Sequence, residues 1–355
     1  MADTSALQSS RPTVLVDGAE APSLTDGQLR MRVREDVHGL YDCELEVGNW
    51  GPNGGQPGFL FFDRRAIDFG KELSLKFSDK PIFTGRITGI EGRYPEGNSP
   101  SVAILAEDRF QDLRMTRRMR TFQDLSDSDA FTKIAGEHAL TPKVSIDGPK
   151  HRVLAQLGQS DLAFLRERAR ALDAELWIDG TTLNVQPRSK RGATPLTLTY
   201  GKELREFHVL ADLAGQTTSV EVTGWDVAGK QMIDERADDG TVAGELAGGV
   251  SGPSVLRSAF GERRDTLASA VPQTAAEARA RATALMKRRT RRFIVGNGTA
   301  QTQPELRVGA TVKLAGLGSL FEGNFYVAAV THLFDGAGGL RTELTVERPG
   351  LGKAA

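Results

Sequence analysis

Cysteine is nearly absent from the sequence, since Cys43 is the only one among 355 residues. A single cysteine excludes an internal disulfide and any CxxC metal or redox motif. Cys43 lies in the segment YDCELEV, where apolar and polar residues alternate as they do in a half-buried β-strand. We therefore predict a small buried strand residue at this position rather than a reactive thiol.

Long apolar runs and an excess of one charge are missing as well. No run approaches the roughly 20 apolar residues that a membrane-crossing helix needs. The first ten residues, MADTSALQSS, lack the basic start and apolar centre of a signal peptide. The 45 basic and 46 acidic side chains give a formal net charge of -1, so the whole chain has no long-range attraction for nucleic acid or anionic lipid. We predict synthesis in the cytoplasm, no membrane partner and no specific nucleic-acid partner.

Motifs for catalysis and for ligand binding are also missing. The histidines do not fall at the H-x3-H or HExxH spacing of metal ligands, and there is no GxSxG elbow, Walker loop or Rossmann fingerprint. The five histidines are His38, His138, His151, His208 and His332. We predict no catalytic, cofactor-binding or metal-binding residue and no cofactor. His332 lies in a strand pattern near the carboxyl end, where a packing or interface role is expected.

What the sequence has in abundance is glycine, with 39 residues spread along the chain. The glycines separate short segments rich in Val, Ile, Leu, Thr and Phe, which predicts a mainly β protein. The segment GNWGPNGGQPG at 48–58 predicts a loop. Because single hydrophobic cores stop growing at about 250 to 300 residues, a chain of this length predicts two or three domains.

Residues 113–190 have a different period from the rest and predict a small α+β domain. A helix is expected at 160–172, because Ser160 can cap its first turn and apolar residues follow at helical spacing. The apolar positions are Leu162, Leu165, Ala169 and Leu172. Another helix is expected at about 127–138. An Asp-Gly turn that follows the helix of 160–172 predicts a hairpin.

The β pattern returns from Leu196 onward. The stretch at about 235–270 is rich in Gly, Ala, Ser and Asp and has no clean period, which predicts a long loop or arm. Thr274 and Glu277 form a capping box, in which each side chain binds a free backbone N–H at a helix start. A helix is therefore expected at about 274–290.

Two segments of the chain share one pattern: a Gly-led strand, an F-x-G that opens a long strand, and a final strand that ends in an acidic-basic pair. An F-x-G can place an aromatic ring inside a barrel and a glycine where the sheet curves. The alternative is chance, since such short patterns recur in β proteins. The repeated positions are Gly70, Phe83, Gly85 and Arg109 in the first segment, and Gly309, Phe321, Gly323 and Arg348 in the second.

Two runs of basic residues are present, at 287–292 and 114–120. The first follows the predicted helix of 274–290, where cations oppose the negative end of the helix dipole. A solvated face is the favoured interpretation, an inter-subunit salt-bridge surface comes next, and a nucleic-acid contact is the weakest. The candidate interface residues in the first run are Arg288, Arg289, Arg291 and Arg292.

The carboxyl-terminal segment 304–350 resembles the closing barrel of the late control D family of phage tail proteins and of the VgrG spike proteins of type VI secretion. The segment 159–177 is similar to the helix and hairpin that follow the first barrel in those families, and 83–91 also fits. The matching positions at the carboxyl end are Pro304, Leu306-Arg307-Val-Gly309, Phe321-Glu-Gly323, Val327 to His332, and Gly339 to Arg348.

This resemblance implies a mainly β fold with an α+β insertion: a tail-tube-like β-barrel at 1–112, a small α+β domain at 113–190, and a second tube-like barrel at 191–350. It also implies a non-enzymatic baseplate hub of a contractile tail or injection system, a homotrimer that adapts a sixfold inner tube to a threefold spike. The expected partners are further copies of the chain, a separate spike protein, an inner tube or tube-initiator protein and other baseplate subunits. The protein would then be a component of the tail or injection particle.

Two other classes of function stay open at this point. One is a β-rich carbohydrate-active enzyme that degrades cell walls, because carboxylates are abundant and a pair could flank a cleft. The other is a nucleic-acid-binding barrel, which the balanced charge disfavours. Within the hub hypothesis, the sequence does not separate a phage tail from an extracellular injection system.

Overall fold

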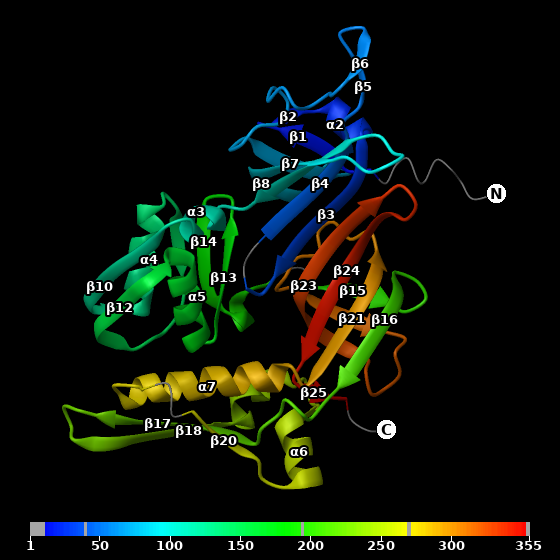
Figure 1. Cartoon of the computed structure of the whole chain (residues 1–355). Helices are drawn as coiled ribbons and strands as arrows, with labels where there is room; N and C mark the ends of the chain where they lie inside the picture. Colours follow the sequence, from blue (N-terminus) through cyan, green and yellow to red (C-terminus); the bar gives the residue numbers. More distant parts are fainter. Residues whose placement is uncertain (1–10, 39–40, 193–194, 268–270, 353–355) are drawn as a thin grey trace. The chain divides into compact units, whose positions relative to one another are not determined.

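The computed structural model of the chain (Figure 1) describes residues 11–38, 41–192, 195–267 and 271–352. These residues form two compact units. The first contains the described residues up to 111 together with 299–308 and 329–344. The second contains those within 112–298, together with 309–328 and those from 345 onward. The strands β21 (Ile294–Gln301), β23 (Gly323–Asp335) and β24 (Gly339–Arg348) therefore contribute residues to both units.

The first unit is built on an antiparallel sheet whose neighbouring strands run in the order β3-β4-β9-β8-β7-β1. The second half of β23 pairs with β3, at residues 329–335 against 30–36. A short hairpin, β5–β6, lies in the predicted loop at 48–58. The elements are β1 Thr13–Val16, β2 Ala19–Glu20, α2 Pro22–Asp26, β3 Gln28–Asp36, β4 Tyr41–Gly48, β5 Gly51–Asn53, β6 Gln56–Gly58, β7 Glu72–Phe77, β8 Lys80–Arg93, β9 Ser101–Glu107 and α3 Phe110–Arg114.

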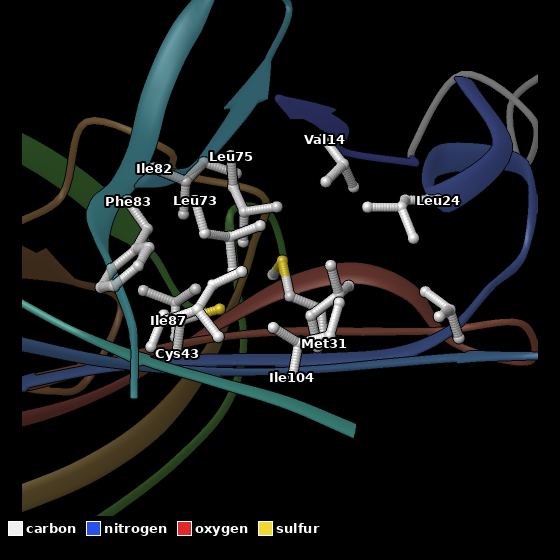
Figure 2. Packing of buried hydrophobic residues seen from close by; sticks show 14 of the residues in the cluster. Val14, Leu24, Met31, Cys43, Leu73, Leu75, Ile82, Phe83, Ile87 and Ile104 are labelled. Atoms are coloured by element: carbon white, nitrogen blue, oxygen red, sulfur yellow. The ribbon is translucent and has the colours of Figure 1, made fainter. Parts of the chain in front are cut away.

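Alternation of apolar and polar residues determines which face of this sheet is buried. In β4 every second residue is buried, from Tyr41 through Cys43 and Leu45 to Val47, and the residues between them are partly exposed. A period of two is what a strand needs to cover a core with one face only. Cys43 is 3% exposed within this core, as the sequence predicts (Figure 2).

The second unit begins with the small α+β part. The helices α4 and α5 each follow a strand of the β10–β12 ribbon, and each begins with a Ser-Asp pair whose serine caps the helix. The interior face of α5 includes Leu162, Leu165 and Ala169, as predicted, and also Phe164 and Arg168. The elements are β10 Arg117–Ser126, α4 Asp127–Glu137, β11 Thr141–Val144, β12 Lys150–Ser160, α5 Asp161–Ala171, β13 Ala174–Asp179, β14 Thr182–Pro187 and η1 Arg188–Lys190.

The stretch at 235–270 is not the long loop or arm that its composition predicts. As far as residue 267 it contains the end of β18 and the elements η2, β19, α6 and β20; residues 268–270 lie outside the described part. The sheet β18-β17-β20 packs its apolar face on α7, which begins after the Thr274 cap as predicted. The elements are β17 Ser219–Asp226, β18 Gln231–Asp238, η2 Asp239–Glu245, β19 Val250–Ser251, α6 Gly252–Phe260, β20 Arg264–Leu267 and α7 Ala275–Arg291.

The other strands of the same 13-stranded sheet lie in the order β16-β21-β24-β23-β22-β15, and we call this part the second sheet. Numbered along the chain, its strands follow the same spatial order as the six strands of the first sheet. The two differ at the last strand, since β15 is parallel to β22 whereas β1 is antiparallel to β7. The elements are β15 Leu196–Thr199, β16 Leu204–Ala211, β21 Ile294–Gln301, β22 Thr311–Ala315, β23 Gly323–Asp335, β24 Gly339–Arg348 and β25 Gly350–Leu351.

These elements confirm the predicted fold class: a mainly β protein with two tail-tube-like β-sheet structures and an α+β insertion. The finer division into domains at 1–112, 113–190 and 191–350 stays a prediction, because the two compact units group the chain differently.

Candidate functional site

The two repeated glycines occupy matching positions in their sheets. Gly70 and Gly309 both have positive φ, +80° and +93°. Gly70 precedes β7, and Gly309 precedes β22, which is the corresponding strand of the second sheet. Gly70 donates its N–H to the carbonyl of Ile87 at 2.9 Å, and Gly309 donates to Val327 at 3.0 Å. In both cases the partner's own N–H returns a bond, 2.9 Å long, to the residue after the glycine. The same rare backbone conformation and the same bond pair support a duplication rather than chance.

Phe83 and Gly85 lie inside β8, on the core side of the first sheet. Phe83 is 1% exposed and contacts the Tyr41 ring edge to face, with the ring centroids 5.2 Å apart. Figure 2 shows Phe83 among the side chains of the same core cluster as Leu73 and Ile87. A Cβ on Gly85 would come within 2.4 Å of the Glu107 carbonyl oxygen and 2.5 Å of the Phe83 ring. Only glycine fits where this ring and strand approach so closely.

The second F-x-G does not occupy the equivalent place. In the first sheet Leu75 pairs with Phe83, and in the second Leu314 pairs with Gly323. Register therefore makes Gly323, not Phe321, the counterpart of Phe83. Phe321 is only half-buried and lies in the turn before β23. The fully buried ring of the second sheet is Phe325, two residues beyond Gly323, and the sequence match of the two F-x-G motifs is offset by two positions.

The basic residue of the carboxyl-terminal pattern, Arg307, forms an ion pair with a buried carboxylate. The Arg307 guanidinium donates to Glu35 through Nε at 2.7 Å and through Nη2 at 3.1 Å, and the Val308 N–H adds a third bond to this carboxylate. Glu35 is 4% exposed. The guanidinium also lies over the Tyr41 ring, 4.4 Å from its centroid. This pair was missed as a site because its members lie at opposite ends of the chain.

His332 is buried beside this pair, in agreement with a packing role. Its Nδ1 lies 3.1 Å from the hydroxyl of Thr342. Burial, with a smaller contribution from the Arg307 charge, lowers the pKa of His332 to about 4. The imidazole is therefore neutral at physiological pH, so it does not supply a charge to an interface.

The basic run at 287–292 does not form a single surface. Arg291 is buried and holds two carboxylates: Asp173 at 2.5 and 3.0 Å, and Glu245 at 2.8 and 2.6 Å. Burial acts to raise the pKa of Glu245, but the hydrogen bond and charge of Arg291 outweigh it and keep the pKa below its ordinary value.

The other three arginines of this run lie nearer to solvent. Arg289 pairs with Asp265 at 2.5 Å. Arg288 is exposed. The Arg292 side chain is 67% exposed and lies 3.9 Å from Glu347. Arg291 therefore fixes the end of α7 internally, and Arg288 and Arg292 are the two left as interface candidates.

The second basic run serves the α+β part. Asp161, at the first position of α5, is 1% exposed. Its carboxylate forms ion pairs with Arg120 at 2.7 Å and Arg118 at 3.0 Å, and it lies 2.8 Å from His138 Nε2. Asp127 holds the same position in α4 and is bound by Arg168 and His151. Two buried carboxylates, each at a helix N-terminus and each paired with cations, bind the helices to the ribbon.

A further charged network lies where η1 meets β23 and β24, all within the second unit. Arg188 bridges Glu175 at 3.1 Å and Glu347 at 2.9 Å, and its guanidinium stacks 3.8 Å from the Tyr326 ring centroid. The Tyr326 hydroxyl donates to Glu175, which also binds Arg191 at 3.1 Å. This network fastens the α+β part to the second sheet. No sequence motif indicates it.

Within the described ranges, no group of three or more His, Cys, Asp or Glu side chains is arranged to hold a metal ion. In the same part of the chain, no helix is long and apolar enough to span a membrane.

Solved structures of similar fold come from phage tails and from type VI secretion. A 43 kDa tail protein of prophage MuSo2 from Shewanella oneidensis has a TM-score of 0.71 at 14% identity, with 96% of this chain and 98% of that chain covered. A tail protein from Neisseria meningitidis has a TM-score of 0.63 at 14% identity, covering 95% and 96%. The c3393 protein of E. coli, a type VI secretion component, has a TM-score of 0.55 at 13% identity, covering 96% and 79%.

At these identities the likeness establishes the fold. No curated protein matches the chain by sequence. A family model described as the Alg8 N-terminal domain matches residues 13–335, which is most of the chain. The chain therefore belongs to the family of the Alg8 N-terminal domain.

Proposed function

We propose that the chain is a structural baseplate hub of a contractile tail or injection system, related to the late control D and VgrG hub proteins. Three copies would form a ring around a central channel, with a sixfold inner tube on one side and a separate threefold spike on the other. The single observation that carries this proposal is the duplicated sheet, with its common strand order and its matching glycines.

The duplication matters because a sixfold ring and a threefold spike cannot meet through identical contacts. Three chains that each carry two similar sheets offer six similar faces to the tube while keeping threefold symmetry toward the spike. The fold shared with phage tail proteins and with a type VI secretion component supports this context. The particle would then be the protein's place of action.

Two buried carboxylates of the α+β part, Asp127 and Asp161, do not have the properties of a glycosidase acid. A glycosidase needs one carboxyl group whose pKa is raised, so that it can act as an acid. Burial acts to raise the pKa values of Asp127 and Asp161, but hydrogen bonds from His151 and Arg168, and from His138 and Gln156, lower both below the ordinary value. Both carboxylates are also occupied by their cations, which leaves neither available to a substrate.

The mass of the purified chain in solution tests this proposal, together with images of the particle that contains it. We expect a homotrimer in light scattering or native mass spectrometry, and three copies at the junction of tube and spike. Six copies per ring would overturn the adaptor role, and turnover of peptidoglycan by the purified chain would favour the enzymatic alternative.

A further inference from the structure

The first unit has a groove on the face of its sheet that is turned away from the core. The groove has a volume of about 530 Å³ and is lined by residues of β3, β4 and β23, by the end of β8, and by the turn and strand that follow β23. All of these residues belong to the first unit. Leu29 and Leu333 line the groove beside charged side chains. Sites that bind small ligands have volumes of about 300 to 1,000 Å³, so this groove is large enough for a ligand.

Strand register places opposite charges in rows across the groove. Arg30 of β3 is paired with Glu46 of β4 on one side and with Asp335 of β23 on the other. The next outward residue of β3, Arg32, is paired with Glu44. Side chains that lie directly opposite on neighbouring strands are within reach of one another, so the pairing alone predicts that each arginine binds a carboxylate.

The two glutamates of the groove are bound mainly by other groups. Arg93, at the end of β8, donates to Glu46 at 2.7 Å and to Glu44 at 2.8 Å. The second oxygen of Glu46 accepts a bond of 2.7 Å from the Ser101 hydroxyl. The second oxygen of Glu44 accepts a bond of 3.2 Å from Arg32. Each oxygen of both carboxylates therefore already has a donor.

Asp335 is occupied in a similar way. Arg341 donates to its Oδ2 at 2.6 Å, and the N–H groups of Ala337 and Gly338 donate to its Oδ1 at 3.0 and 2.7 Å. These bonds, that of Arg341 first, lower the pKa of Asp335 below its ordinary value, so the carboxylate is ionised at neutral pH. Both of its oxygens are thus taken by the residues of its own turn and strand.

Arg30 is left without a partner among the residues that the structure describes, although an acidic residue is paired with it on either side. Arg32 uses one of its five N–H donors, toward Glu44. The groove therefore has unused donors on two neighbouring arginines, whereas each carboxylate oxygen in its lining is already bound. Such a site binds an anion, and the planar fork of an arginine matches the two oxygens of a carboxylate.

The balance of charge in the groove determines which kind of anion fits. Its arginines are equalled in number by carboxylates once Glu91, which Arg93 also binds at 3.0 Å, is counted. A polyanion such as nucleic acid needs an excess of positive charge, which is missing here. A single carboxylate next to an apolar side chain fits better, because Leu29, which is 47% exposed, and Leu333 lie beside the free guanidinium donors.

We propose that this groove binds a short acidic segment of a partner protein. An Asp or Glu carboxylate of the segment accepts hydrogen bonds from Arg30 and Arg32. A neighbouring apolar side chain of the segment packs on Leu29 and Leu333. Such binding involves one chain, goes beyond the hub function and does not depend on the number of copies in a ring.

The test selects a displayed library of random short peptides on the full-length native chain and on two variants. Arg30→Gln removes the free guanidinium without breaking an ion pair of the described residues. Arg34→Gln is the matched control, because Arg34 lies on the same face of β3 with its side chain 51% exposed but does not line the groove. Thermal unfolding checks that both variants are folded, and calorimetry measures the affinity for the enriched peptides.

We expect the native chain and Arg34→Gln to enrich the same peptides, in which Asp or Glu stands beside apolar residues. Arg30→Gln should lose at least about tenfold in affinity for these peptides, because hydrogen bonds to a charged group are lost. Neither substitution should change the thermal unfolding appreciably, since both side chains are exposed.

The proposal is overturned if no peptide is enriched, if the enriched peptides lack acidic residues, or if Arg30→Gln and Arg34→Gln bind them equally. A single-stranded oligonucleotide that displaces the peptides would assign the groove to a phosphate polyanion instead. Self-association of the native chain that Arg30→Gln weakens and Arg34→Gln does not would assign the groove to a second copy. Each of these results is independent of whether the chain forms a trimeric hub.

Discussion

Glu35 and Arg307 form a bidentate ion pair although 272 positions separate them in the chain. Glu35 lies in β3, and Arg307 belongs to the segment 299–308 that joins the first unit. The pair therefore connects the amino-terminal sheet to a segment near the carboxyl end, within one compact unit. It also gives a physical reason for the basic residue in the carboxyl-terminal sequence pattern.

Replacing Arg307 with Met should destabilise the first unit by about 3 kcal/mol, because the buried Glu35 carboxylate then loses the cation that donates two hydrogen bonds to it. The double variant with Glu35→Gln should recover part of this loss, since the uncompensated charge is gone. Cys43 lies in the core of the same unit, so the rate at which its thiol is labelled in increasing urea reports this unfolding. Labelling of Arg307→Met at the native urea midpoint would contradict the prediction.

Two adjacent arginines provide a sharper comparison. Arg291→Met should cost about 3 kcal/mol, because Glu245 then loses its cation and Asp173 keeps only Lys287, 3.4 Å away. Arg292→Met should change stability by less than about 0.5 kcal/mol, since that side chain is mostly exposed. Denaturant unfolding followed by circular dichroism measures both. Equal effects of the two substitutions would mean that the run acts as one charged surface.

Local pattern was a good guide to elements whose boundaries depend on nearby residues. The helix start at Thr274 and the interior positions Leu162, Leu165 and Ala169 follow from capping and from helical period, and the structure confirms them. The prediction of a long loop or arm at 235–270 was wrong. The helix α6 and its neighbouring strands are short and are stabilised by tertiary packing, which the amino-acid composition does not show.

Local sequence patterns did not predict strand register or the pairing of residues that are far apart in the chain. The F-x-G match suggested that Phe321 corresponds to Phe83, but backbone pairing makes Gly323 the counterpart, and a shift of two residues keeps the same side of the strand. A basic run likewise reads as one surface in sequence. Only the fold shows that Arg291 is buried between two carboxylates while Arg292 is exposed.

The interior face of α5 can be tested with one charge. Leu165→Asp should unfold the α+β part, because an unpaired charge would be buried at a position that is 0% exposed, at a cost of several kcal/mol. Ala163→Asp places the same side chain on the exposed face of the first helical turn and should be neutral or slightly stabilising. Limited proteolysis and circular dichroism follow the outcome. A fully stable Leu165→Asp would show that the assigned face is wrong.

The lowered pKa of His332 predicts that acid destabilises the first unit. Its pKa is about 4 in the folded protein, whereas an unperturbed histidine has a pKa of 6.5. As the pH falls from 6.5 toward 4, His332 becomes protonated in the unfolded chain but stays neutral in the folded chain. The free energy of unfolding therefore decreases through this interval. The full difference corresponds to about 3 kcal/mol at 1.36 kcal/mol for each pKa unit. The free energy of unfolding should therefore be lower at pH 4 than at pH 7 by about this amount because of His332 alone.

The variant His332→Gln isolates the effect, because glutamine stays neutral at every pH while the carboxylates of the unit titrate as before. We expect the native protein to lose stability relative to His332→Gln between pH 7 and pH 4, with urea midpoints read from Cys43 labelling. The direction distinguishes a buried neutral imidazole from an ion-paired one. A histidine that gained a carboxylate partner in the folded state would instead lose stability as the pH rises, so a reversed trend would place a charged His332 beside Glu35 and contradict its assignment as a neutral core residue.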